Sequence, residues 1–393
     1  MKTGALRAAS YRYPRPMRWL VFGTYDKGRH PRVGVMIEGL RAAGDGVVEV
    51  NTPLDLDTAA RVELLRQPWR IPFAIGRLAK CWIQLARRSS GTDVDAVLVG
   101  YFGHLDVRLA RTLFRRTPIV LDHLISLAGT AADRGLATPR GPMERTLAAI
   151  DRGAIRAADL VVVDTEEHAA VAELDKVVVV AVGAEDDWFA ARPAGPANLS
   201  RGGLRVVFFG LFTALHGTAT LGRALGELAG ADIEFTIIGT GQDSAECRRL
   251  AAGNANVTWL DWVSRAELPA LVAAHDVCLG IFGTTDKAGN VVPTKVYQGA
   301  AAGCAIVTAD TGPQRRVLKD AAAFVPAGNS SALAEVLRQL AADPPRLAEL
   351  RSAAACRADS AFRAVSVVAP LRDRLALFSA NVAVRWAQGT RVK

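Results

Sequence analysis

The sequence contains few cysteines and no recognisable metal-binding spacing. Its 393 residues include five cysteines, and no two of them form a C-x-x-C pair, which excludes a disulfide framework and the common zinc motifs. Scattered, reduced thiols are typical of the cytoplasm, so we expect a cytoplasmic protein. Long apolar runs are also missing: residues 177–182 are strand-sized, far from the ~20 apolar residues of a membrane-spanning helix. The first apolar run, 19–22, is too short for a signal peptide.

Positive charge is concentrated in the first part of the chain. The formal net charge is +9, and residues 1–150 hold 23 Lys and Arg against 13 Asp and Glu, whereas the remainder holds 25 against 26. Within this part, residues 72–88 place Arg77, Lys80 and Arg87 at helical spacing between apolar side chains. Such a helix can lie on an anionic membrane surface, or it is a domain helix with a solvated charged face, which is the commoner case. No nucleic-acid-binding motif accompanies the charge, and we expect no nucleic acid partner.

Short β-branched runs alternate with helix-length segments along the whole chain, which is typical of parallel α/β sheets. A polar passage rich in Gly and Pro interrupts the alternation near its middle, after which the pattern restarts. We therefore predict an α/β protein with two doubly wound Rossmann-like domains. The predicted divisions are a first domain at 1–187, a linker at 188–203, a second domain at 204–363 and a helical tail at 364–393.

The segment 290–310 has the pattern of a ligand-binding turn. Pro293 suits the start of a helix, Gly303 ends it, and a β-branched strand at 305–308 follows directly. Lys295 lies in the first turn of the predicted helix, where free backbone N–H groups favour an anion. The segment therefore indicates a site for an anionic ligand.

This segment resembles the donor site of the GT-B glycosyltransferases, in particular the retaining family 4 or group 1, which carries a P-x-K-x-x-E-like run. Three other segments resemble family motifs in the same order. The loop from Gly210 to Gly217 is similar to G-R-x-x-x-x-K-G, the strand ending at Gly241 is similar to I-x-G-x-G, and a strand and loop through Val263 follow. The resemblance implies the GT-B fold, with the two domains facing a central cleft and the tail helix crossing back onto the first domain.

The resemblance also implies which residues hold the donor, a nucleotide-diphosphate sugar. Lys295 is the implied catalytic cation at the diphosphate. Leu211 stands in place of the family's arginine, His216 of its lysine and Gln298 of its glutamate, so the site has fewer charges than the family pattern. His216 is alternatively a capping or core histidine. The implied donor-binding residues are Gly210, His216, Gly217, Gly239, Gly241, Val263, Asn290, Val291, Pro293, Thr294, Tyr297 and Gln298.

Loops of the first domain are expected to face the cleft, because open α/β sheets bind ligands at the carboxyl ends of their strands. His104 and Asp106 follow one predicted strand and are candidates for binding acceptor hydroxyls. Asp122 and His123 close the next strand and are candidates for catalytic contact with the transferred sugar. All four are alternatively turn or capping residues, and Asp106 is placed to cap a helix that begins near residue 107.

No metal or other cofactor is expected. The D-x-D strings at 55–57 and 93–95 lie in a polar loop and just before a strand, which is not where a metal clamp forms. The resemblance implies transfer with retention of configuration, metal-independent, to an acceptor that is a glycan, a lipid-linked molecule or a small molecule. Two alternatives stay open: a nucleotide-sugar epimerase of GT-B fold, and a non-catalytic partner subunit that binds nucleotide sugars. The expected location is cytoplasmic, including the inner face of the membrane.

Overall fold

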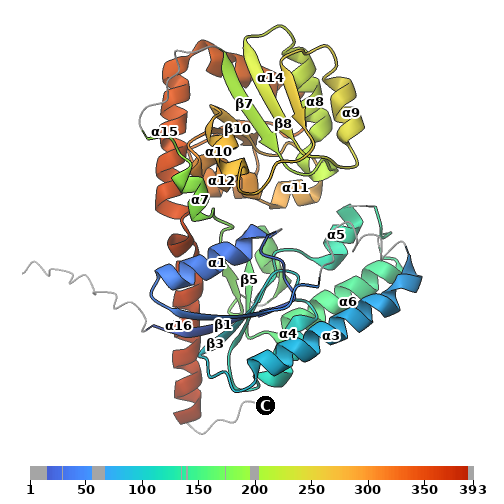
Figure 1. The fold of residues 1–393 in the computed structure, drawn as a ribbon, viewed down its shortest axis with the longest axis vertical. Coiled ribbons are helices and arrows are strands. Elements are labelled where there is room, and N and C mark those ends of the chain that lie inside the picture. Colours follow the sequence, from blue (N-terminus) through green and yellow to red (C-terminus); the bar gives the residue numbers. More distant parts are fainter. Residues whose placement is uncertain are drawn as a thin grey trace, which may run out of the picture.

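The computed structural model describes residues 16–28, 30–54, 67–133, 135–138, 140–172, 174–194 and 203–387. Two layered α/β units lie one above the other, joined on one side by a long helix (Figure 1). This confirms the predicted fold class. The predicted strands are present. The central ones are short apolar runs that a parallel sheet buries on both faces, whereas the strands at two edges are partly exposed.

The first sheet has the order β2-β1-β3-β4-β5-β6, and every neighbouring pair is parallel. Its strands are β1 (Arg18–Gly23), β2 (Gly46–Asn51), β3 (Ala96–Val99), β4 (Ile119–Asp122), β5 (Leu160–Val163) and β6 (Val177–Val179). The helices of this half are α1 (Pro31–Ala42), η1 (Pro68–Arg70), α3 (Ile71–Ser89), α4 (Asp106–Leu113), α5 (Leu127–Asp133), α6 (Pro142–Ala157) and η2 (Glu167–Val171).

Alternate residues of the first sheet face two helical layers. Trp19 and Val21 of β1 pack in a cluster with residues of α1 and of the C-terminal helix. Leu20 and Phe22, on the opposite face, pack with residues of α3, α4 and α6. This alternation follows from the two-residue repeat of a strand, and it makes the sheet the centre of a three-layer domain.

The second sheet has the order β12-β11-β10-β7-β8-β9, again with every neighbouring pair parallel. Its strands are β7 (Leu204–Phe209), β8 (Ile233–Ile238), β9 (Val257–Leu260), β10 (Val277–Leu279), β11 (Ala305–Ala309) and β12 (Ala323–Val325). Its shorter helices are α7 (Asp186–Ala190), η3 (Ala214–His216), α9 (Ser244–Leu250), α10 (Leu268–Ala273) and α11 (Asp286–Asn290). The longer ones are α8 (Thr218–Glu227), α12 (Thr294–Ala301), α13 (Gly312–Leu318), α14 (Ser330–Ala342) and α15 (Pro344–Ala361).

The passage predicted as a linker is partly built into the second domain. Trp188 of α7 is buried in that domain's core and stacks on Phe209 with ring centroids 5.7 Å apart. Burying an indole ring lowers the free energy of folding by more than an exposed linker would permit. The chain therefore folds into a short helix that packs this ring against the second domain. Residues 195–202 of the predicted linker lie outside the described residues.

Helix α16 (Ala364–Ala387) returns to the first domain and packs along α1 (Figure 1). Gly39 allows this approach, since a side-chain carbon there would lie 2.1 Å from the carbonyl oxygen of Ala364. A buried ion pair secures the helix: Arg372 donates to both carboxylate oxygens of Asp45, at 2.8 and 2.9 Å. None of the described helices is both long enough and apolar enough to cross a membrane.

Candidate active site

A cavity of about 1140 Å³ opens between the two domains and is lined by residues of both. It lies at the carboxyl ends of the strands. The spatial order of the strands reverses on either side of β1 in the first sheet and of β7 in the second, and ligands of open α/β sheets bind outside such reversal points. Tyr101 follows β3, and Gly210 follows β7; both line the cavity. The fold therefore creates one large site shared between the domains.

Lys295 is the central charged group on the second-domain wall. It lies in the first turn of α12, is 4% exposed and lines the cavity. Its Nζ has no hydrogen-bond partner among the described residues and lies 3.7 Å from the ring centroid of Phe208. Burial lowers the pKa of Lys295 to about 7. An ammonium with no counter-charge, next to free N–H groups of a helix N-terminus, is ready to pair with an anion.

Gly210 and His216 lie next to this ammonium. A side-chain carbon on Gly210 would lie 3.0 Å from Lys295 Nζ and 3.5 Å from His216 Nε2, so the absence of a side chain leaves the backbone accessible there. Burial, with the neighbouring Lys295, lowers the pKa of His216 to about 2. His216 Nδ1 lies 3.0 Å from Thr213 Oγ1. In the ligand-free protein this histidine is therefore neutral. Lys295, not His216, is the group that can supply positive charge at Gly210.

Several other predicted donor residues also line the cavity. Pro293, Thr294 and Gln298 belong to the start and first turns of α12, and Gln298 is buried. Val263 lines it from the loop after β9, next to Trp262, whose ring is 77% exposed. The structure therefore brings these predicted residues together around Lys295.

The predicted glycines support the site from behind. Gly239 has a φ of 125° and approaches the Gly210 loop so closely that a side-chain carbon would lie 2.0 Å from the carbonyl oxygen of Gly210. Gly241 likewise approaches Phe212, and Gly217, with a φ of 64°, precedes α8 and abuts Phe282. These positions shape the loop around Lys295 without lining the cavity.

Three other predicted donor residues lie away from the cavity wall. Tyr297 is fully buried in the core, with its ring 4.8 Å from that of Phe362, because its position on α12 faces α15 and not the cavity. Val291 is half-buried, and Asn290 is exposed at the end of α11. The carbonyl oxygen of Asn290 accepts a hydrogen bond of 2.9 Å from Thr165 Oγ1 in the first domain. The placement of these three gives no support to a role in donor binding.

In the first domain, Asp106 turns inward. It is the first residue of α4, and its carboxylate accepts hydrogen bonds from Thr24 N, Thr24 Oγ1 and Trp82 Nε1, each at 2.8 Å. Asp106 therefore joins the loop after β1 and α3 to α4. Because α4 begins at Asp106 itself, with Leu105 at the N-cap position, Asp106 is not the predicted cap. It is also not among the described residues that line the cavity.

Asp122 is likewise committed to the interior. Its Oδ1 accepts a hydrogen bond of 2.8 Å from Arg32 Nε, and both side chains are almost completely buried. Arg32 Nη1 also donates to the carbonyl oxygen of Val180. Burial raises the pKa of Asp122, although Arg32 opposes this shift. Asp122 is therefore joined through Arg32 to α1 and to the residue that follows β6, and it does not line the cavity.

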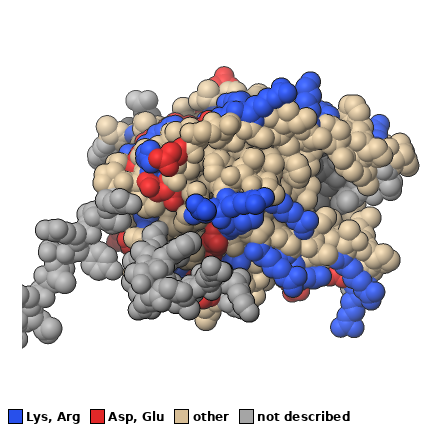
Figure 2. All heavy atoms as spheres, turned by 90° about the horizontal axis from the view of Figure 1, so that it is seen from below, with Lys and Arg blue, Asp and Glu red and all other residues tan. Residues whose placement is uncertain are grey.

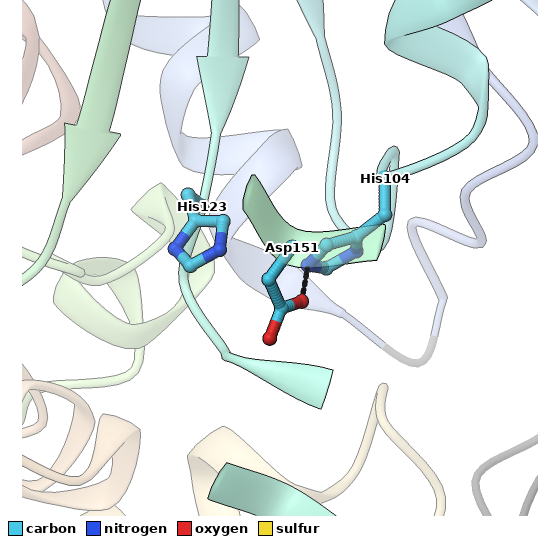
Figure 3. Close-up of side chains that lie close together, drawn as sticks. All are labelled: His104, His123 and Asp151. Atoms are coloured by element: carbon cyan, nitrogen blue, oxygen red, sulfur yellow. Dashed lines mark ion pairs between the residues drawn. The ribbon is translucent and has the colours of Figure 1, made fainter. Parts of the chain in front are cut away.

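His104, His123 and Asp151 form a buried cluster (Figure 3). Their potential ligand atoms all lie within 4.8 Å of one another, and His104 Nε2 lies 3.3 Å from Asp151 Oδ1. Both oxygens of Asp151 already accept hydrogen bonds, from Ser126 Oγ and from N–H groups at the start of α5. Burial lowers the pKa of both histidines, that of His104 to about 4. Neutral imidazoles with a carboxylate can ligate a divalent ion, but here the carboxylate is engaged in holding α5.

Aromatic and acidic groups on the cavity wall were not predicted from the sequence. Tyr101 and Phe102 line it, and Phe102 has a φ of 65°, a backbone conformation that a bulky residue rarely adopts. Glu185 also lines it and is buried, and burial raises its pKa to about 7. Arg265 of the second domain forms an ion pair with Glu185 and donates to the carbonyl oxygen of Lys27 at 2.8 Å. No motif marks these residues, since they meet only when the domains face each other.

Comparison with known proteins places this geometry in a class. The family described as glycosyl transferases group 1 matches residues 203–343, which is most of the second domain. A search of curated proteins found no match to the sequence. Among solved structures, sucrose-phosphate synthase from Thermosynechococcus elongatus is similar with a TM-score of 0.65 and 16% identity, over 96% of this chain and 100% of that one.

Two further similar structures contain nucleotide sugars. HepE from Anabaena, solved in complex with UDP-glucose, has a TM-score of 0.63 and 15% identity, over 93% of this chain and 100% of that one. The E. coli trehalose-6-phosphate protein bound with UDP-2-fluoro glucose has a TM-score of 0.60 and 14% identity, over 93% and 98%.

These likenesses establish the GT-B fold. Together with the family match, which covers residues 203–343, they indicate a glycosyltransferase whose second domain is similar to group 1.

Proposed function

We propose that this glycosyltransferase moves a sugar from a nucleotide-diphosphate sugar to an acceptor, with retention of the anomeric configuration and without a metal ion. The proposal rests mainly on the environment of Lys295. Its buried ammonium has no hydrogen-bond partner, lines the cavity and lies beside the side-chain-free Gly210. A diphosphate in this position supplies the missing counter-charge. Its oxygens accept hydrogen bonds from the N–H groups at the start of α12.

The proposed donor is a UDP-sugar. HepE was solved with UDP-glucose and the E. coli protein with UDP-2-fluoro glucose, and both share the fold of this chain. Val263 and the exposed Trp262 provide an apolar surface on the cavity wall for the base. Gln298 is placed to share hydrogen bonds with hydroxyl groups of the nucleotide, as an acceptor and a donor.

The proposed reaction takes place on one face of the sugar. The acceptor oxygen bonds to the anomeric carbon on the face from which the diphosphate leaves, and the bond between that carbon and the diphosphate oxygen breaks. The acceptor's proton passes to the leaving diphosphate, so the products are a glycoside and a nucleoside diphosphate. Lys295 stabilises the negative charge that develops on the diphosphate, which is the role a metal ion has in other enzymes.

A donor panel tests the proposed function. The purified chain is incubated with UDP-, GDP-, ADP- and TDP-sugars, and release of the nucleoside diphosphate is measured alongside the same assay on Lys295→Met. We expect slow release from UDP-sugars, lost in the variant. Binding of UDP-sugars without any turnover would support the non-catalytic subunit instead, and reversible conversion of the free nucleotide sugar would support the epimerase.

Retention needs its own measurement. Once an acceptor is found, the anomeric coupling constant of the new glycoside, measured by proton NMR, reports its configuration relative to the donor. A product of inverted configuration would contradict the proposed single-face reaction.

We also propose that the enzyme works in a reducing compartment at the inner face of a membrane. All five cysteines are free, which supports the first part. The basic first domain supports the second, because the surface of the cytoplasmic leaflet is negatively charged.

A further inference from the structure

We propose that α3 docks on an anionic lipid surface and that the acceptor is a lipid-linked molecule that enters the cavity from the N-terminal end of this helix. The inference rests on the proposed function, because it names the acceptor class of that site. The outward face of α3 carries apolar and basic side chains together.

Helix α3 is attached to the domain by a narrow inner face. Of its 19 residues only Leu85 and Ser89 are buried. Trp82 is half-buried and donates to Asp106 through its ring nitrogen at 2.8 Å, so this tryptophan belongs to the inner side. The helix contains no acidic residue. Most of the surface of α3 is therefore exposed, and all charged side chains of the helix are basic.

The outer face combines large apolar residues with cations. Phe73, Lys80 and Arg87 follow one another at intervals of seven residues, so they lie along one side of the helix, and all three are exposed. Ile83 lies beside this row with 54% of its surface exposed, and Phe73 is 72% exposed. Trp69, in the turn before the helix, is 73% exposed.

The surface around α3 has the same charge. Helices α3 and α4 lie on the underside of the first domain in Figure 1, and the view from below shows Lys and Arg over that face with few acidic residues (Figure 2). Arg115 and Arg116, which follow the end of α4, are also exposed. Apolar rings between cations match a phospholipid surface, where the rings enter the acyl boundary and the cations meet anionic headgroups.

The same helix reaches the active site. Ile71, its first residue, lines the cavity and is exposed. The first-domain wall also includes the apolar residues Phe102, Leu127, Leu136 and Leu147, alongside the polar groups of His30, Tyr101 and Thr130. The cations Lys287, Lys295 and Arg265 are all on the second-domain wall. A lipid-linked acceptor fits this distribution of side chains. Its polar head would lie beside the donor sugar, and its apolar chain would run along the first-domain wall toward Ile71. The volume of about 1140 Å³ exceeds the ~300–1,000 Å³ of ordinary ligand sites, which leaves room for donor and acceptor head together.

Co-sedimentation with vesicles tests the docking. The full chain is mixed with phosphatidylcholine vesicles, with or without phosphatidylglycerol, and the bound fraction is measured for wild type and for Lys80→Glu with Arg87→Glu. We expect binding only to the anionic vesicles and a loss of at least roughly thirtyfold in the variant. Loss of each cation near such a surface costs about fivefold, and the two new carboxylates are repelled in addition. The matched control is Arg338→Glu with Arg346→Glu in the second domain, which makes the same change in net charge and should bind nearly as wild type does.

Quenching by brominated lipid tests the geometry. Bromine on the acyl chains quenches tryptophan fluorescence only where the ring enters the bilayer, so wild type should be quenched and Trp69→Phe should lose most of this quenching. Trp262→Phe, which removes an equally exposed ring on the cavity wall, should be quenched as wild type is. Binding that does not depend on anionic lipid, or quenching that survives Trp69→Phe, would overturn the docking.

Three further measurements separate the alternatives. If sedimentation velocity shows a dimer that Phe73→Ser dissociates, the face joins two copies of the chain and the proposal is wrong. Extracts of membrane lipids and water-soluble glycans are offered separately as acceptors with a UDP-sugar; transfer only to the soluble fraction would overturn the acceptor class. Thermal stabilisation by UDP, measured on each α3 variant, should equal that of wild type, so that loss of docking is distinguishable from failure of the donor site.

Discussion

The ammonium of Lys295 lies 3.7 Å from the ring centroid of Phe208, fully buried and without a hydrogen-bond partner. The aromatic face stabilises the cation in part, but no carboxylate neutralises it. A charge held in this way costs free energy until an anion arrives. Lys295 therefore lowers the stability of the ligand-free protein, and its ammonium is the group in the cavity that should bind a diphosphate most strongly.

Replacing Lys295 by methionine should separate these two effects. The variant should raise the free energy of unfolding of the ligand-free protein by about 1 to 3 kcal/mol, which is the usual cost of a buried unsatisfied donor. UDP should no longer stabilise it, and kcat should fall roughly 10²- to 10³-fold, as when one transition-state donor is removed. Thermal unfolding with and without UDP and a turnover assay measure these three quantities. Full activity in the variant at saturating donor would contradict the assignment.

Proton uptake should accompany binding of UDP. Burial lowers the pKa of Lys295 to about 7, and a bound diphosphate raises it again, so at pH 8 binding should take up close to one proton. Titration calorimetry in two buffers of different ionisation enthalpy measures this number. His216→Gln should retain the uptake and Lys295→Met should lose it; equal uptake in both variants would assign the proton to another group.

Stability without ligand should depend on pH through the same lysine. Its pKa is about 7 when folded and about 10.4 when unfolded, so the unfolded chain binds more protons between these values. The free energy of unfolding should therefore rise with pH across that window for this group. Denaturant titrations from pH 6.5 to 9.5 on wild type and Lys295→Met give the difference. A slope that is the same in both proteins would show that Lys295 keeps an ordinary pKa in the folded protein, and would contradict this prediction.

The packing of Gly239 against Gly210 should be needed for donor binding. In Gly239→Ala, the new carbon meets the carbonyl oxygen of Gly210 at 2.0 Å and the φ of 125° is strained, so the loop must move and UDP affinity should fall at least about tenfold, a loss of ~1.4 kcal/mol. Gly76→Ala in α3 is the control, because no atom lies within 4 Å of the added carbon. It should stabilise the protein by about 0.5 to 1 kcal/mol through helix propensity and leave UDP binding unchanged.

Arg372 should determine whether α16 stays docked. Arg372→Ala removes the counter-charge of the buried Asp45, although Met17 N and Trp19 Nε1 still donate to that carboxylate. The loss should cost about 3 to 5 kcal/mol of stability, and proteolysis should then cut the chain within α16. Arg374→Ala, two residues later, removes one hydrogen bond to the carbonyl oxygen of Leu174 and should cost only about 1 kcal/mol. If both variants unfold at the same denaturant concentration, the buried pair is not what secures the helix.

Chelation should leave transfer unchanged, because Lys295 and the start of α12 stabilise the diphosphate without a metal. Turnover is compared before and after EDTA treatment, with added Mg²⁺, Mn²⁺ and Zn²⁺. Activity lost with EDTA and restored by one ion would contradict the proposal and direct attention to His104, His123 and Asp151, whose ligand atoms lie within 4.8 Å of one another. His104→Gln would then abolish the restoration.

The positions of strands were predictable because a parallel strand needs only a short apolar run, and such runs are visible in the chain itself. The lysine was predictable for a similar reason, since Pro293, Lys295 and Gly303 are close in sequence. The polar residues of the first domain were harder. His104, Asp106 and Asp122 follow strands as predicted, but their side chains turn inward to Asp151, Thr24 and Arg32. The direction of a loop side chain depends on partners that are distant in sequence.

The sequence by itself determined the two α/β domains, the helix that carries Lys295 and the excess of positive charge in the first domain, because each depends on neighbouring residues. Only the tertiary structure decided that Glu185 and Arg265 meet at the cavity, that Tyr297 packs in the core and that Phe73, Lys80 and Arg87 form the outer side of α3. These outcomes depend on which faces the domains and helices bury, and that choice minimises exposed apolar surface over the whole chain at once.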